Sequence, residues 1–166
     1  EYAEPNLAPK TFHRYEEVIN SRIVPALGYT VVSKIGPLHI VEFENSLRRD
    51  GIRKDGRPGG LSERTILHHH RILSVIFNTA VQWGILKENP VSRVKPPRVP
   101  KKKAPSYNEE QTAAMMDALE EEPLKYQAMV HLALATGLRR GEMMGLEWSD
   151  LDFEKGTLEV SRASQY

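Results

Sequence analysis

The most informative stretch of this chain is ATGLRRGEMMGLEWSDLD, residues 135–152. Gly137 predicts the end of one helix, and a second, short helix is expected to begin at about Arg140. Arg139 therefore lies beside a predicted helix N-terminus, whose unpaired backbone N–H groups attract anions. Glu142 follows Arg139 by three residues and falls on the same turn.

Arg139 and Glu142 are the candidate catalytic residues of this stretch. A carboxylate at this spacing can hold a guanidinium in one pose. The planar guanidinium stays charged and can donate two parallel hydrogen bonds to a phosphate. The spacing fits a phosphate-binding arginine with a positioning carboxylate, and it fits an ordinary surface salt bridge as well.

The same stretch resembles the first catalytic-arginine motif of the tyrosine recombinases, or phage integrase family. That motif reads roughly T-G-hydrophobic-R-x-x-E-hydrophobic-hydrophobic-x-L-x-W-x-D-hydrophobic-D. The residues in register with it are Thr136, Gly137, Arg139, Glu142, Leu146, Trp148, Asp150 and Asp152. Upstream, the run from Leu61-Ser62 to Asn89-Pro90 looks like the last helices of the family's core-binding domain, so the resemblance covers nearly the whole chain from about Leu7.

The resemblance implies a mechanism and a partner. In the family a tyrosine attacks a DNA phosphodiester, forms a 3′-phosphotyrosyl bond, and is later displaced by a 5′-hydroxyl, with no metal or other cofactor. Arg139 would bind a non-bridging oxygen of the scissile phosphate, and Glu142 would position Arg139. The partner would be double-stranded DNA, with the full-length protein acting as a tetramer on two duplexes.

The family's other catalytic groups come later in sequence than this chain extends. They are a hairpin lysine, a His-x-x-Arg motif, a further His or Trp, and the nucleophilic tyrosine. Tyr166 precedes the expected lysine and cannot align with the nucleophile. We therefore expect the 166-residue chain to bind DNA as a monomer without cleaving it.

The segment PPRVPKKKAP, residues 96–105, predicts a linker, because its four prolines favour extended backbone and its basic residues are strongly solvated. It divides the chain into residues 1–95 and residues 106–166. We expect a mainly α protein. A SAM-like, four- to five-helix core-binding bundle comes first, followed by the N-terminal part of an α+β catalytic domain with a small β-hairpin.

Charge differs sharply along the chain. Residues 1–103 hold 18 Lys and Arg and 10 Asp and Glu, a net charge of +8; residues 104–166 hold 5 and 12, a net charge of −7. A basic half suggests a polyanionic partner, although charges can also cluster by chance on solvated surfaces. With no cysteine and no long apolar run, the chain is expected to be cytoplasmic, without disulfides or a membrane span.

In the first domain, helices are predicted from about Pro9 to an exit marked by Pro25 and Gly28, from Pro37 to Arg49, and from Ser62 to Gly84. The apolar side chains expected to face inward are Phe12, Tyr15, Ile19, Ile23, Ile40, Phe43, Leu47, Ile66, Leu73, Ile76, Phe77 and Ala80. The Gly-rich segment 51–60 resembles a phosphate cradle only superficially, since no Lys-Ser/Thr follows it.

The predicted DNA-binding side chains lie on the polar side of this domain and in the linker. They are Arg64, His68 and Arg71, then Lys10 and Arg14, and finally Lys101, Lys102 and Lys103. The run His68-His69-His70 is not expected to bind metal, because successive helical side chains point about 100° apart. His69 and His70 should border the core while His68 is exposed.

In the second domain, Asn108 and Gln111 predict a capping box that begins a helix to about Glu121. A helix from about Pro123 to Ala135 is expected to bury Met129, Leu132 and Ala133, and Glu154-Lys155-Gly156 predicts a hairpin turn.

Three other functions stay open at this point. A recombinase that resolves chromosome dimers would share the chemistry. A non-catalytic DNA-binding accessory or regulatory module would share the basic first half. In a helical adaptor protein, the two oppositely charged halves would attract each other.

Overall fold

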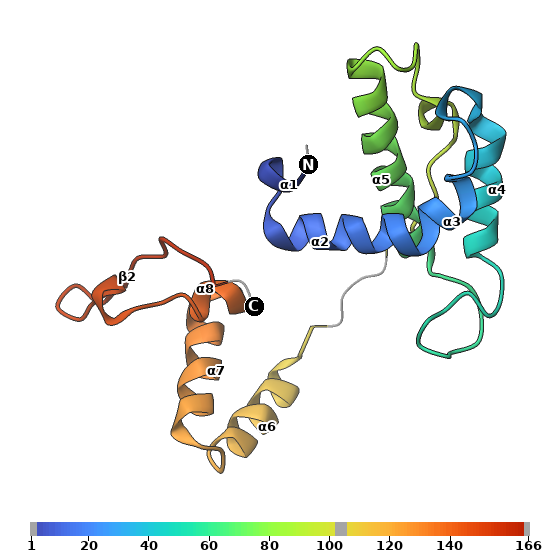
Figure 1. The fold of residues 1–166 in the computed structure, drawn as a ribbon. Helices are drawn as coiled ribbons and strands as arrows, with labels where there is room; N and C mark the ends of the chain where they lie inside the picture. Colours follow the sequence, from blue (N-terminus) through green and yellow to red (C-terminus); the bar gives the residue numbers. More distant parts are fainter. Residues whose placement is uncertain (1–2, 102–105, 165–166) are drawn as a thin grey trace. The chain divides into compact units, whose positions relative to one another are not determined.

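The computed structural model describes residues 3–101 and 106–164 (Figure 1). The chain forms two compact units, Glu1–Lys102 and Lys103–Tyr166, and the division falls within the segment that we interpret as the linker. Helices dominate both units, and the strands of the described residues form one two-stranded antiparallel sheet. The expected mainly α fold with a small hairpin is therefore confirmed.

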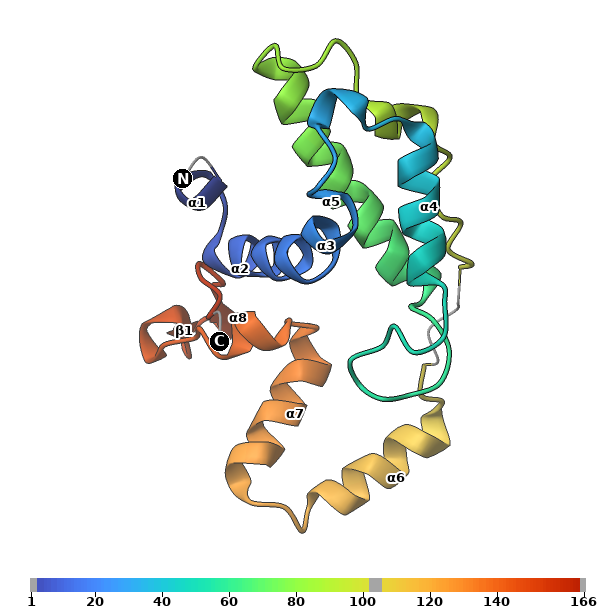
Figure 2. The same cartoon turned by 45° about the vertical axis from the view of Figure 1, so that its right-hand side comes forward.

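Unit 1 is a bundle of short helices around one long helix. Its elements are α1 (Ala3–Asn6), α2 (Pro9–Val18), the π-helix η1 (Ile19–Ile23), α3 (Val24–Leu27), η2 (Val32–Lys34), α4 (Pro37–Leu47), α5 (Glu63–Gln82) and η3 (Pro90–Arg93). Helices α4 and α5 lie side by side, and the run from α2 to α3 crosses α5 (Figures 1 and 2).

The first helical run contains a π turn that the sequence pattern did not predict. Its signature is the backbone N–H of Val24, which donates to the carbonyl of Ile19, five residues earlier. Pro25 follows directly. Its ring has no N–H and would collide with the carbonyl four residues back in a regular helix, and a wider turn relieves both problems. Pro25 therefore does not end the run, which continues to Leu27 before Gly28.

Apolar side chains of α2 to α5 and η3 form one core in unit 1. Its buried members are Val18, Ile23, Leu27, Ile40, Phe43, Leu47, Ile66, Ile72, Leu73, Phe77, Val91 and Val94. Tyr15 and Ile19 are only partly buried against it. The prediction for Ile76 is wrong, because this side chain is exposed while Ile72 is fully buried. The α2–α3 run crosses the N-terminal half of α5, whereas Ile76 lies in the C-terminal half, beyond this crossing (Figure 1).

Local signals place the long helix and the loop before it. Ser62 caps α5 as predicted, its hydroxyl accepting from the backbone N–H of Thr65. Asp50 closes the loop, because its carboxylate accepts from the backbone N–H groups of Gly51, at 3.0 Å, and Gly59, at 2.5 Å. The loop thus has a fixed base at the start of α5.

The described residues of unit 2 form three α-helices, one 3-10 helix and a hairpin. Its elements are α6 (Glu109–Leu119), α7 (Leu124–Thr136), α8 (Arg140–Met143), η4 (Trp148–Asp150), β1 (Leu151–Asp152) and β2 (Thr157–Leu158). The predicted capping box is present, with Asn108 and Gln111 exchanging side-chain and backbone hydrogen bonds. The predicted hairpin is also present, since Leu151 pairs with Leu158 across it.

Unit 2 buries little apolar surface. Among its described residues, Leu119 is the one buried hydrophobic side chain. The prediction that Met129 is buried is wrong, and Leu132 and Ala133 are only half-buried. The apolar side chains of α7 are spread around the helix instead of gathering on one face, so they form no single buried stripe.

Within the described ranges, no helix is long and apolar enough to cross a membrane.

Candidate active-site arginine and nucleic-acid interface

The turn after α7 positions the candidate arginine. Helix α7 ends at Thr136, and Gly137 adopts a left-handed conformation with φ of 67° that side chains disfavour. The backbone N–H of Gly137 donates to Ala133, and the Thr136 hydroxyl accepts from the N–H of Leu138 at 3.3 Å. The chain therefore reverses within two residues and delivers Arg139 to the start of α8.

Glu142 holds Arg139 through both its backbone and its side chain. One carboxylate oxygen accepts from the Arg139 backbone N–H at 2.8 Å, and the other accepts from Nη1 at 3.0 Å. These two hydrogen bonds, the backbone one first, lower the pKa of the Glu142 carboxyl. The Arg139 side chain is 86% exposed, whereas that of Glu142 is 23% exposed. A guanidinium fixed at one edge and open to solvent at the other is suited to bind an anion.

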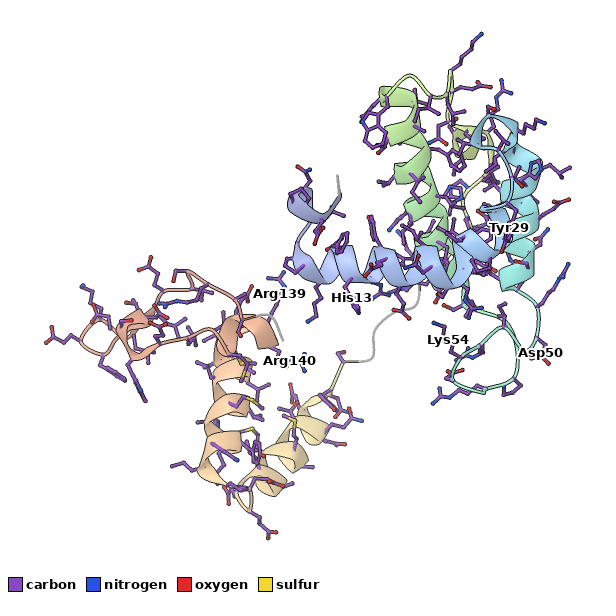
Figure 3. The ribbon with its side chains drawn as sticks, in the orientation of Figure 1. His13, Tyr29, Asp50, Lys54, Arg139 and Arg140 are labelled. Atoms are coloured by element: carbon purple, nitrogen blue, oxygen red, sulfur yellow. The ribbon has the colours of Figure 1, made fainter. Side chains whose placement is uncertain are left out.

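The dipole of α8 adds little to this site. We expected anion attraction from a helix N-terminus, but α8 has four residues, and the aligned peptide dipoles that produce the effect are few. The positive charge at this turn therefore comes from side chains, of which Arg139 is held in place by Glu142. Arg140 lies beside Arg139 at the head of α8 (Figure 3) and is exposed.

The segment that follows the hairpin, residues 162–164, packs against α8. The backbone N–H of Ser164 donates to the Gly141 carbonyl at 2.8 Å. A Cβ at Gly141 would approach the Ser164 carbonyl oxygen to 3.0 Å, and one at Gly145 would approach the Arg162 oxygen to 3.1 Å. Gly141 and Gly145 thus allow the returning chain to pack closely against α8.

Arg162 is a residue that sequence reasoning missed. Its guanidinium bridges the carboxylates of Glu147 and Asp150, which joins the returning chain to the turn before the hairpin. The pKa of the Asp150 carboxyl is lowered by the backbone N–H of Glu147 and then by Arg162. Asp152 accepts from the backbone N–H groups of Glu154 and Lys155. Asp150 therefore stabilises the turn before the hairpin, and Asp152 stabilises the turn within it.

In unit 1, three of the predicted DNA-binding residues line one groove of about 720 Å³. They are Lys10 and Arg14 of α2 and His68 of α5. Arg14 Nε donates to His68 Nε2 at 3.2 Å. Arg64 and Arg71 are exposed on α5 but do not line this groove. Lys101 is exposed as well, whereas Lys102 and Lys103 lie outside the described residues.

Sequence reasoning also missed three cations of the same groove. Arg22 of η1 donates from Nη2 to the Ile52 carbonyl at 2.6 Å, and Lys54 lies 3.5 Å from a Glu17 carboxylate oxygen. Arg53 comes from the same loop. These contacts fold residues 51–60 against the first helical run. The three basic residues of GIRKDGRPGG were the sequence signal for this part of the groove.

The histidine run is divided between core and groove. His69 and His70 are buried as predicted, with Nδ1 of His69 2.7 Å from the Thr65 carbonyl oxygen and Nδ1 of His70 2.7 Å from Glu44 Oε1. His68 is half-buried, not exposed, because it packs edge-on against Tyr15. Burial lowers the pKa of both His68 and His69. Among the described residues, no group of three or more potential ligands gathers to hold a metal ion.

Two segments of the chain match known protein families. Residues 106–165 match the phage integrase family, and residues 1–48 match the phage integrase N-terminal SAM-like domain. The chain belongs to the phage integrase family. Both the predicted family and the predicted SAM-like first domain of this integrase-family chain are thereby confirmed.

Curated relatives cover most of this integrase-family chain. It is 33% identical over 161 residues to the tyrosine recombinase XerC-like protein of Caldanaerobacter subterraneus, with 93% of the chain and 38% of the relative covered. It is 29% identical over 144 residues to the ICEBs1 integrase of Bacillus subtilis, with 87% and 37% covered. The chain therefore spans less than two fifths of the length of these relatives.

A solved structure resembles the chain along almost all of its length. The Tn1549 transposon integrase, in complex with a circular intermediate DNA, superimposes with a TM-score of 0.74 at 25% identity. The match covers 95% of this integrase-family chain and 48% of the transposon protein.

Proposed function

We propose that the chain is the DNA-binding part of a site-specific tyrosine recombinase that integrates or excises a mobile element. The observation that carries this proposal is the exposed Arg139 of the family's motif, whose guanidinium and backbone N–H each donate one hydrogen bond to Glu142. The integrases among the relatives favour a mobile element over the resolution of chromosome dimers.

Arg139 would act on the phosphate that is attacked. Its free N–H groups would bind a non-bridging oxygen and stabilise the negative charge that builds there in the transition state. Glu142 would not touch DNA; it would keep the guanidinium from rotating. The tyrosine that forms the phosphotyrosyl bond would come from sequence beyond residue 166, so the 166-residue chain would not cleave DNA.

The groove of unit 1 would hold the DNA backbone. Lys10, Arg14 and His68 line it, while Arg64 and Arg71 would extend the contact along α5. Contacts of this kind supply affinity that falls with salt and carries little sequence information. The linker lysines would add further phosphate contacts.

The test of the active-site assignment uses the full-length protein and a nicked suicide substrate that traps the covalent adduct. Arg139→Ala should slow adduct formation by about 10²- to 10³-fold, the usual loss on removing one donor to a developing oxyanion. Arg140→Ala is the matched control, because it removes the same charge one residue away, and it should react at a rate near that of the wild type. Equal losses in both variants would show that Arg139 has no special role.

Further expectations concern assembly and location. The full-length protein should act in the cytoplasm as a tetramer on two duplexes, whereas the 166-residue chain should sediment as a monomer. The same suicide substrate should give no adduct with the 166-residue chain, although the chain should retard a duplex in a salt-dependent way. An adduct would contradict the assignment of the nucleophile to downstream sequence.

A further inference from the structure

The loop of residues 51–60 forms one wall of the unit 1 groove, and this wall carries the acidic residue Asp55 beside its basic residues. Asp55 accepts from Arg53 Nε at 2.8 Å and from Nη2 at 2.5 Å, a two-point contact with the guanidinium. The Arg57 guanidinium lies 3.9 Å away, and the Arg57 backbone N–H donates to the same carboxylate at 3.3 Å. One acid therefore faces two of the loop's arginines.

The loop that carries this acid is held in place independently of it. Asp50 closes its base, Arg22 binds the Ile52 carbonyl, and Lys54 pairs with Glu17 on α2. The hydrogen bonds from Arg53 hold the pKa of Asp55 at about 2, so the carboxylate is ionised at any working pH. Arg53 thus faces a permanent internal anion at the groove.

Asp55 occupies the Nε and Nη2 edge of Arg53, one of the edges through which a guanidinium can bind a DNA phosphate. Guanidinium binds carboxylate and phosphate in the same forked geometry, so both cannot bind that edge at once. We propose that Asp55 competes with DNA phosphates for Arg53 and thereby limits the affinity of the groove for DNA of any sequence. This inference rests on the proposed function of the groove.

The physical consequence would be selectivity. Phosphate contacts favour every sequence equally, so a protein with too many of them stays on non-specific DNA. An internal competitor removes part of that sequence-independent affinity and leaves contacts elsewhere unchanged. Asp55 would therefore widen the ratio between specific and non-specific binding.

The experiment measures binding of the 166-residue chain to a fluorescein-labelled duplex of arbitrary sequence, by anisotropy over a series of salt concentrations. Asp55→Asn keeps the size of the side chain and an acceptor for the Arg57 backbone N–H. It should tighten binding about two- to fivefold, the range for freeing one exposed ion pair. The slope of log K against log salt should steepen by about 0.9, because one more phosphate is neutralised.

Two controls separate competition from general charge and from loop damage. Glu42→Gln removes one negative charge from an exposed position on α4, away from the groove, and should change affinity less than Asp55→Asn. In an Arg53→Gln background, Asp55→Asn should have little effect, since the contested donors are gone. A loosened loop would weaken binding and would not steepen the slope.

The outcomes distinguish this inference from the proposed function. Suppose that the wild type binds DNA in a salt-dependent way. If Asp55→Asn then changes the affinity no more than Glu42→Gln does, or changes it equally in the Arg53→Gln background, the inference alone is overturned. Absence of any salt-dependent binding by the wild type would overturn the proposed function of the groove and the inference with it.

Discussion

The buried pair formed by Glu44 and His70 should couple α4 to α5 strongly. The two side chains are 6% and 10% exposed, and Glu44 Oε1 lies 2.7 Å from His70 Nδ1. His70→Leu leaves the Glu44 carboxyl buried without its partner, which costs about 3–5 kcal/mol. Glu44→Leu leaves a buried imidazole nitrogen unpaired, which costs about 1–3 kcal/mol.

The double variant Glu44→Leu/His70→Leu should lie within about 1 kcal/mol of the wild type, because both polar groups are gone and leucine fills the space. The two single changes then couple by about 3 kcal/mol or more. Hydrogen exchange measured by mass spectrometry on peptides from α4 and α5, over a series of urea concentrations, reports unit 1 separately from unit 2.

The control for this cycle is Glu42→Leu, an exposed position on the same helix. It should change the free energy of unfolding by less than about 0.5 kcal/mol. If the two single losses simply add in the double variant, the hydrogen bond between Glu44 and His70 does not stabilise the contact between the helices, and the reasoning is refuted.

Three further predictions concern pH, the linker and the loop. Burial lowers the pKa of His68 and His69 below 6.5, so the folded state binds fewer protons than the unfolded state. The free energy of unfolding should therefore be insensitive to these groups above pH 6.5 and should fall as the pH drops below it. If the urea midpoint of the double variant His68→Gln/His69→Gln declines with falling pH as much as that of the wild type, this prediction is contradicted. Replacing Lys101, Lys102 and Lys103 by Gln should weaken binding to all sequences alike and flatten the salt slope by about 0.9 per lost contact; selective loss of cognate binding would mean that the lysines read bases. A Cβ at Gly60 would overlap the Arg48 backbone, so Gly60→Ala should lower the urea midpoint of unit 1 by an amount equivalent to about 1–3 kcal/mol. Gly36→Ala, where a Cβ meets open space, should cost less than about 1 kcal/mol.

Local physics explains which parts of the fold could be predicted. The Ser62 cap, the capping box of Asn108 with Gln111, and the contact of Arg139 with Glu142 all join groups three residues apart. At that separation the helix geometry alone brings the partners together. These features were therefore visible in the sequence.

Features that depend on tertiary packing could not be read in this way. Arg162 meets Asp150 across the hairpin, and Glu44 meets His70 from another helix. The exposure of Met129 follows from how little of α7 its neighbours in unit 2 cover. The contribution of Arg53 and Lys54 to the groove could not be predicted either, because it depends on residues 51–60 folding back onto α2.

The π turn before Pro25 also determines which side of α2 faces α5, because it sets how far α2 is rotated about its axis relative to α3. The turn holds one residue more than a regular helix does, and each residue turns the helix by about 100°. Loss of a single codon within residues 19–23 would rotate Lys10 and Arg14 away from His68 without altering any of them. Natural variation in this family should therefore tolerate substitutions in this short stretch far better than changes in its length.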